Sequence, residues 1–389
     1  MRNFIIGTSS HISGLCHSIV RGELFTTCSV GCIYCYARWY RGPHGKPKPI
    51  FEVFKLIKSL GEVIREGYPV IPIRFSALSD PFQPPAKITL KALKIALRNE
   101  VPVVINTKLI PSERHLKVLE DLASNNLAIL QVSIPADKDY KEVKVIEPFA
   151  PSIEERFKLV EKASSLGIPV IVRVQPLIPG LGDRNVENFV ERVAESGAIM
   201  VILEFLRIEK ELMPLFSKLF GEENYKSWVS YLPLSQEAPL LQPPLEYRIR
   251  VAEIFSRESS KFGLYFSTCK EGLYHLHEPK DVDCCGFKFL GNSTRRPTLW
   301  DLFLEVYEKG KARGEDLWVR CEREGLLCRD KLKLYPPWLY KGLRMHEKRL
   351  ESILKKPRLV EKLVPSLTHD EEEEVFYLKA NSTRGSGMK

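Results

Sequence analysis

The stretch GELFTTCSVGCIYCYARWY, residues 22–40, joins a strand-like run to three closely spaced cysteines, Cys28, Cys32 and Cys35. Its first six residues have the length and composition of a buried strand, and the cysteines follow directly. Thiolates select zinc or iron–sulfur clusters. A structural zinc site would need paired Cys-x-x-Cys knuckles with a fourth ligand nearby, whereas only the distant Cys16 and His44 are available here. The spacing favours a cubane cluster with one iron left open to a small molecule.

Strand-like runs recur along the first half of the chain, and helical patterns separate them. The runs lie at 22–27, 69–76, 102–107, 127–134, 168–175 and 199–206. One intervening helix should begin at a capping box formed by Ser152 and Glu155. This rhythm predicts an α/β fold, a partial (β/α)6 barrel over residues 1–207, with the cysteines at the mouth formed by the carboxyl ends of the strands. A flat doubly wound sheet is the alternative.

The alternation fades after Arg207. Residues 208–365 are expected to form a mainly helical, cysteine-containing extension, with one short strand at GLYFST. Its basic second half is interleaved with Trp318, Tyr335, Trp338 and Tyr340. Such a segment could follow a phosphate backbone while its aromatic rings stack on bases, although a solvated helical face has the same pattern. Residues 366–389, with an acidic run and then small polar residues, are expected to form a disordered tail.

The charge, the apolar runs and the cysteine count indicate the partners, the compartment and the role of the cysteines. The formal charge of +9 over 389 residues favours anionic partners such as DNA or RNA. We find no secretory signal and no apolar run of membrane-spanning length, so a cytoplasmic protein without a membrane partner is expected. In a reducing compartment, nine cysteines favour metal ligation over disulfides. A candidate second iron–sulfur cluster or zinc site therefore consists of Cys269, Cys284, Cys321 and Cys328. The alternative is that these cysteines are small buried hydrophobic residues.

The motif Cys28-x-x-x-Cys32-x-Tyr34-Cys35, placed after a first strand, resembles that of the radical S-adenosylmethionine (SAM) superfamily. Further stretches, SDPFQP at 79–84, NTK at 106–108, VSIPA at 132–136, IEPFAPSIEERFKLV at 146–160 and VRVQPLIPGLGD at 172–183, resemble its spore photoproduct lyase-like, or DNA repair photolyase-like, members. The resemblance implies a [4Fe-4S] cluster on the three cysteines, SAM on its open iron, and an electron donor such as ferredoxin or flavodoxin. It also implies that SAM is cleaved to a 5′-deoxyadenosyl radical that abstracts hydrogen from a substrate.

The resemblance also implies which residues contact SAM. Ser79 would meet the amino group of SAM, with Asp80 shaping the turn, and Lys108 would pair with the carboxylate. Ser133 would face the ribose or methionyl part, and Tyr34 would lie near the adenine. Simpler interpretations remain: a rim lysine, a strand-end hydroxyl, and an aspartate that only forms the turn before a proline.

Five other residues have separate expectations. Glu147 and Arg156 are expected to form a structural ion pair. Glu204 and Arg207, at the end of the sixth run, are expected to face the mouth of the barrel. Ala77 departs from the family pattern, because photoproduct lyases have at this place a cysteine that donates hydrogen to the product radical.

Three functional hypotheses stay open at this point. The first is a radical SAM enzyme, a lyase or other type, that acts on DNA or RNA in repair or modification. The second is a radical SAM enzyme that acts on a peptide or a small metabolite. The third is a nucleic-acid-binding protein in which the cluster or zinc is only structural.

Overall fold

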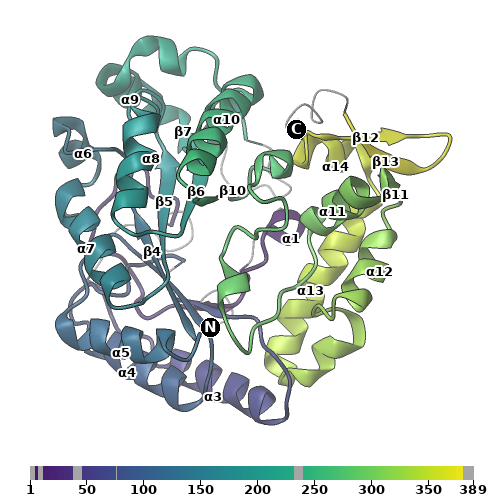
Figure 1. The fold of residues 1–389 in the computed structure, drawn as a ribbon, viewed down its shortest axis with the longest axis horizontal. Coiled ribbons are helices and arrows are strands. Elements are labelled where there is room, and N and C mark those ends of the chain that lie inside the picture. The colour runs from purple at the N-terminus through teal and green to yellow at the C-terminus, as the bar shows by residue number, and fades with distance from the viewer. Residues whose placement is uncertain (1–4, 8–11, 38–45, 76, 232–239, 380–389) are drawn as a thin grey trace.

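A seven-stranded parallel sheet forms the centre of the molecule in a computed structural model, which describes residues 5–7, 12–37, 46–75, 77–231 and 240–379 (Figure 1). The strands follow the order β1-β2-β3-β4-β5-β6-β10. Their bounds are β1 Arg21–Gly22, β2 Ile73–Phe75, β3 Val103–Thr107, β4 Ala128–Ser133, β5 Val170–Leu177, β6 Met200–Phe205 and β10 Tyr265–Thr268. Every neighbouring pair is parallel, so all the carboxyl ends lie at one edge.

Helices connect the strands and line the outer side of the curved sheet in Figure 1. They are α3 Glu52–Arg65, α4 Lys87–Arg98, α5 Glu113–Ala123, α6 Lys141–Ile146, α7 Ile153–Ser165, α8 Val186–Glu195 and α10 Leu245–Lys261. The predicted capping box is confirmed, since Ser152 accepts a hydrogen bond from the Glu155 amide and the Glu155 carboxylate accepts one from the Ser152 amide. Gly167, at a φ of 74°, ends the same helix in a conformation that favours glycine.

The sheet has one strand more than the sequence pattern indicated. Helix α10 and strand β10 continue the alternation beyond Arg207, and Tyr265 pairs with Met200 of β6. The GLYFST segment was expected as an isolated short strand of the extension. It was not assigned to the barrel because the long segment before it, with its proline-rich part, lacks the regular βα spacing. Part of that intervening segment forms α9 Met213–Phe220 and a small sheet of β7 Ile208–Glu209, β8 Val229–Ser230 and β9 Leu240–Gln242.

The C-terminal region packs as a second, mainly helical layer beside the sheet, shown in yellow-green and yellow in Figure 1. It contains α11 Leu299–Lys309, α12 Asp316–Arg323, α13 Pro337–Leu354, α14 Pro357–Leu363 and a sheet of β11 Lys311–Ala312, β12 Leu367–Asp370 and β13 Val375–Leu378. Within the ranges given above, no helix combines the length and apolar character that a bilayer crossing requires.

The expectation of a disordered tail from residue 366 is wrong for the part of that tail that the structure describes. Strands β12 and β13 pair antiparallel, and the acidic run at 371–374 is the turn between them. Leu367 and Phe376 are buried in the C-terminal core. The charges lie at the exposed hairpin tip while the flanking apolar residues face inward, which is why composition alone was misleading. Residues 380–389 lie outside the described residues.

The N-terminal helix α1, Ile12–Leu15, is fastened to the C-terminal region. The Ser13 hydroxyl lies 2.6 Å from Nδ1 of His346 on α13. Arg296 donates through Nη1 to the carbonyl oxygens of Ser13 at 3.0 Å and Cys16 at 3.1 Å. Residues 13–16 are therefore held in place by side chains 280 or more positions further along the chain.

Candidate functional site

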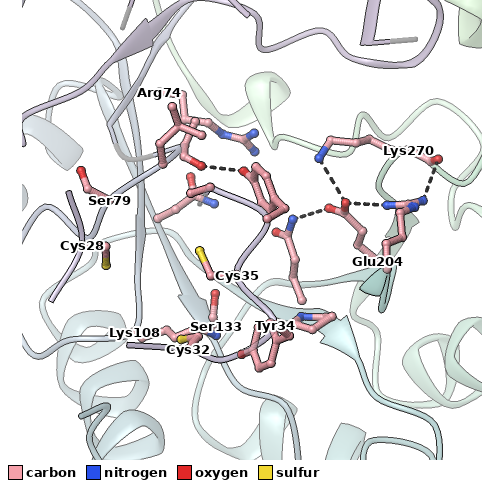
Figure 2. Close-up of a pocket in the computed structure, with 18 of the residues that line it drawn as sticks. Cys28, Cys32, Tyr34, Cys35, Arg74, Ser79, Lys108, Ser133, Glu204 and Lys270 are labelled. Atoms are coloured by element: carbon pink, nitrogen blue, oxygen red, sulfur yellow. Dashed lines mark hydrogen bonds and ion pairs between the residues drawn. The ribbon is translucent and has the colours of Figure 1, made fainter. Parts of the chain in front are cut away.

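A cavity of about 480 Å³ lies at the carboxyl ends of the strands, and it brings together the residues singled out from the sequence (Figure 2). Its lining includes all eight of the first predicted set, Cys28, Cys32, Tyr34, Cys35, Ser79, Asp80, Lys108 and Ser133. The volume is in the range of ordinary cofactor and ligand sites. Glu204 and Arg207 also line it, as expected for residues near the end of β6.

The cysteine loop follows β1 directly and is clamped by backbone and side-chain hydrogen bonds. Gln83, fully buried, accepts from the Ser29 amide at 2.7 Å and donates to the Thr27 carbonyl at 2.7 Å. The Ile33 amide donates to the Ile146 carbonyl at 3.0 Å. Gly31 has a φ of 71°, and an added Cβ would lie 2.9 Å from Phe149, so glycine is required there. Sequence analysis quoted Gln83 in a motif but gave it no role.

The three thiols have the donor chemistry of a cluster site. Burial raises the pKa of Cys28 to about 12 and also raises that of Cys32, so both side chains are protonated until a metal displaces the protons. Among the described residues, no three His, Cys, Asp or Glu side chains gather as ligands of a single ion. A [4Fe-4S] cluster differs, because each thiolate binds a separate iron at a separate corner of the cube. Three thiols spread along one cavity wall therefore fit a cluster better than a lone zinc ion.

Glu23, fully buried just after β1, organises the loop that carries Ser79. Its carboxylate accepts hydrogen bonds from the amides of Ala77 and Leu78, both at 2.9 Å, and from the Ser79 hydroxyl at 3.2 Å. Sequence analysis missed Glu23. A glutamate inside an otherwise apolar strand-like run was the available signal, because a buried carboxylate needs specific partners.

Asp80 does more than form a turn. Its carboxylate accepts from the Phe82 amide at 3.0 Å, which is the local turn, and also from the Lys108 amide at 2.7 Å and the Thr107 hydroxyl at 2.9 Å. These bonds tie the loop after β2 to the loop after β3. Asp80 therefore sets the backbone position from which Lys108 reaches into the cavity.

Glu147 is the centre of a buried network below the cysteine loop. The predicted ion pair with Arg156 is confirmed at 2.5 Å, and Lys108 Nζ lies 3.0 Å from the other carboxylate oxygen. Tyr34, whose ring lines the cavity, donates its hydroxyl to Glu147. Burial alone would raise the pKa of Glu147, but Arg156 and Lys108 outweigh it and hold that pKa at about 2. Glu147 is thus an anion at neutral pH, and its carboxylate holds the Lys108 side chain.

A second charged network forms another part of the cavity wall (Figure 2). Glu204 accepts from Arg207 at 2.8 Å and from Lys270 at 3.1 Å, and Arg207 also pairs with Glu271 at 2.8 Å. Burial opposes ionisation of Glu204, but Lys270 and Arg207 hold its pKa at about 2. Sequence analysis did not find Lys270, because it follows the strand β10 that had not been assigned to the barrel.

The predicted auxiliary metal set is wrong. Cys321 and Cys328 form a disulfide within the C-terminal core, whereas Cys269 and Cys284 are buried in the core around the main sheet. The four sulfurs therefore belong to two different places. Sequence spacing could not reveal this division, because it gives no information on which helix each cysteine packs against. The disulfide also contradicts, for Cys321 and Cys328, the expectation that metal ligation explains the cysteines better than disulfides do.

The aromatic residues of the basic C-terminal segment are mainly structural. Trp318 and Tyr335 are buried, and the Tyr335 hydroxyl accepts a hydrogen bond from the Ile71 amide at 2.9 Å. Trp338 and Tyr340 pack partly buried against the main core. At least Trp318 and Tyr335 are not available to stack on nucleic-acid bases.

Comparisons with known proteins agree with this site. A family model described as the radical SAM superfamily matches residues 23–193. An uncharacterized protein, ORF301 of Acidianus two-tailed virus, is 30% identical over 174 residues, which are 39% of this chain and 57% of that protein. The chain thus spans little more than half the length of this curated relative.

Solved structures of spore photoproduct lyase share the fold. A double mutant with bound AdoMet and dinucleoside spore photoproduct has a TM-score of 0.52 at 17% identity, over 64% of this chain and 76% of that one. A single mutant has a TM-score of 0.51 at 17% identity, over 64% and 77%. The family model, the shared fold and the three cysteines after β1 lead to one conclusion. Residues 23–193 resemble the radical SAM superfamily in sequence and spore photoproduct lyase in fold.

Proposed function

We propose that this chain holds a [4Fe-4S] cluster on Cys28, Cys32 and Cys35, binds SAM beside it, and uses SAM cleavage to abstract hydrogen from a substrate. The observation that carries the proposal is that the three thiols share one cavity with Ser79, Lys108 and Ser133. The bound cluster would supply the single electron that breaks the sulfonium bond of SAM, after reduction by a donor such as ferredoxin or flavodoxin.

The chain's own residues would orient SAM. Lys108 offers an ammonium group to the SAM carboxylate, with Asp80 fixing its backbone and Glu147 its side chain. Ser79 and Ser133 offer a hydroxyl group each from the loop after β2 and the end of β4. The apolar part of the lining, including Val30 and Leu78, would exclude water from the reacting atoms.

We propose Cys16 as the residue that donates hydrogen to the product radical. Ala77, which stands at the place of the family's donor cysteine, has no thiol for this role. Both residues line the cavity. Burial raises the pKa of Cys16 to about 11, so its sulfur keeps a hydrogen at neutral pH. A product radical would take that hydrogen atom, and the thiyl radical left on sulfur would regain one electron from the external donor and one proton from solvent. In D₂O, wild-type product should contain deuterium from the thiol, and the product of Cys16→Ala should not.

The test of the enzyme proposal is anaerobic reconstitution with iron and sulfide, followed by dithionite and SAM. Wild-type protein should form 5′-deoxyadenosine, and the triple variant Cys28→Ala, Cys32→Ala, Cys35→Ala should form none. The double variant Cys321→Ala, Cys328→Ala is a matched control, since its sulfurs lie outside the cavity. Wild-type protein with a full cluster and no 5′-deoxyadenosine would overturn the proposal in favour of a structural cluster.

For the substrate we propose a nucleic acid, supported by the formal charge of +9. Binding to DNA or tRNA should weaken steeply with salt, because each phosphate contact releases counterions. A flat salt response would instead favour a peptide or a small metabolite.

A further inference from the structure

Arg74 is a buried cation on the inner face of the sheet. It is the middle residue of β2, between Ile73 and Phe75, which are fully buried. Successive strand side chains point to opposite faces, so Arg74 alone of the three points inward, where it lines the cavity. Only 8% of it is exposed.

Its guanidinium lacks partners on one side. Neither Nε nor Nη2 of Arg74 has a hydrogen-bond acceptor among the described residues. Arginine stays charged in proteins, and a buried charge without a partner is strongly unfavourable. Nε and one Nη together form the edge that binds the two oxygens of a carboxylate or phosphate side by side.

Other cations of the cavity have carboxylates in place. Lys108 has Glu147 at 3.0 Å, Lys270 has Glu204 at 3.1 Å, and Arg207 has both Glu204 and Glu271 at 2.8 Å. Within the described ranges, Arg74 has no ion pair within 4 Å. Arg74 is therefore a cation of this cavity that has no carboxylate partner among the described residues, and the ionisable groups that interact most strongly with it are the thiols of Cys285, Cys16 and Cys269.

The position of Arg74 separates it from the expected SAM contacts. In Figure 2 Cys35 lies between Arg74 on one side and Lys108 and Ser133 on the other. The Tyr36 hydroxyl donates to the Ala77 carbonyl at 2.6 Å, and Lys270 Nζ lies 5.5 Å from the centre of the Tyr36 ring. An anion on Arg74 would thus stand across the cysteine loop from the carboxylate that Lys108 is proposed to hold.

We propose that Arg74 binds an oxyanion of the substrate, a phosphate or a carboxylate, through its guanidinium group. This inference rests on the proposed function, and it adds a requirement on the substrate. A substrate anchored there would be held at one end by charge-assisted hydrogen bonds while its reacting carbon faces the SAM side of the cavity.

The test uses small anions on the reconstituted protein saturated with SAM and kept unreduced, so that no turnover occurs. Dimethyl phosphate, methyl phosphate and acetate are titrated separately by calorimetry, and the tightest binder distinguishes a phosphodiester, a phosphomonoester and a carboxylate. Arg74→Met should weaken binding of that anion roughly 10- to 100-fold, as expected for charge-assisted hydrogen bonds. Arg74→Lys should weaken it less. Arg98→Met, which removes an exposed arginine of α4, should have no effect.

Folding and function are monitored separately. Arg74→Met removes a buried charge that has no carboxylate partner, so its melting temperature without added anion should equal or exceed that of wild type. If no probe binds, or if Arg74→Met binds it as well as wild type does, the subsite does not exist. If the probe binds only without SAM, Arg74 is a SAM contact and the proposal fails. Failure of 5′-deoxyadenosine formation with intact anion binding would instead overturn the proposed function alone.

Discussion

Replacing Glu147 with glutamine should expose how strongly the buried network below the cysteine loop holds the fold. The substitution keeps the shape but removes the charge that faces Arg156, whose side chain is 1% exposed, and Lys108, at 15%. Breaking a buried pair by removing one partner costs about 3–5 kcal/mol. With an unfolding entropy of about 2.1 cal/mol/K per residue over 389 residues, roughly 0.8 kcal/mol/K, the melting temperature should fall by about 4–6 °C.

The matched control is Glu113→Gln, which breaks an ion pair with Lys162 on the surface, where Glu113 is 79% exposed. Exposed pairs contribute about 0–1 kcal/mol, so that variant should melt within about 1 °C of wild type. Differential scanning fluorimetry on both variants measures this. Equal melting temperatures for Glu147→Gln and Glu113→Gln would refute the reasoning.

The dependence of stability on acidic pH provides an independent check on the contribution of the Glu147 charge. Its pKa is about 2 in the folded chain against an ordinary 4.5, so its contribution to stability is complete above about pH 4.5 and is lost as the pH falls through about 2. The full shift corresponds to a stabilisation on the order of 3 kcal/mol. The difference between wild type and Glu147→Gln should therefore narrow between about pH 5 and about pH 3. A constant difference would mean that packing, rather than charge, is responsible.

Three further predictions address the site and the C-terminal layer. Gln83→Ala removes both bonds that clamp the cysteine loop, so absorbance of the reconstituted cluster near 400 nm should decay at least about tenfold faster with a chelator, unlike in Asn99→Ala, which loses a comparable bond on α4. Asp80→Asn weakens the bond that fixes the Lys108 backbone, so it should raise the KM for SAM about tenfold with a smaller change in kcat. Rates of 5′-deoxyadenosine formation measure both constants. A fall in kcat as large as the rise in KM would argue against a positioning role. Alkylation of denatured, oxidised protein should label seven of the nine cysteines, and all nine after reduction. Nine labelled thiols without reductant would contradict the disulfide. Loss of the disulfide should lower the free energy of unfolding by about 2 kcal/mol.

Sequence patterns were most informative where the determinants were local. The capping box at Ser152 and most of the strand-like runs are set by neighbours in the chain and lie where expected, although β1 is Arg21–Gly22 rather than residues 22–27. The eight site residues line one cavity, as the family resemblance implied. Parallel strands then bring their carboxyl ends together without further information. The family resemblance assigned Cys28 and Ser133 to one site, and the parallel sheet brings these distant residues to the same cavity.

Long-range partners were not predictable in this way. Arg74 and Lys270 matter because they line the cavity beside residues that are distant in the sequence. No short-range sequence pattern contains that information. The pairing of Cys321 with Cys328 depends on how the C-terminal helices pack. The acidic hairpin at 371–374 has the composition of a solvated tail, and only the burial of Leu367 and Phe376 identifies it as folded.

The fastening of α1 to the C-terminal region has a consequence for how the site is assembled during synthesis. Cys16 leaves the ribosome early, but Arg296 and His346, which hold its segment, emerge hundreds of residues later. Until then the sheet can form while one wall of its cavity is still unsecured. The cysteine loop is therefore synthesised long before the residues that secure this wall, and during that interval iron and sulfide would have open access to the thiols of the proposed cluster site.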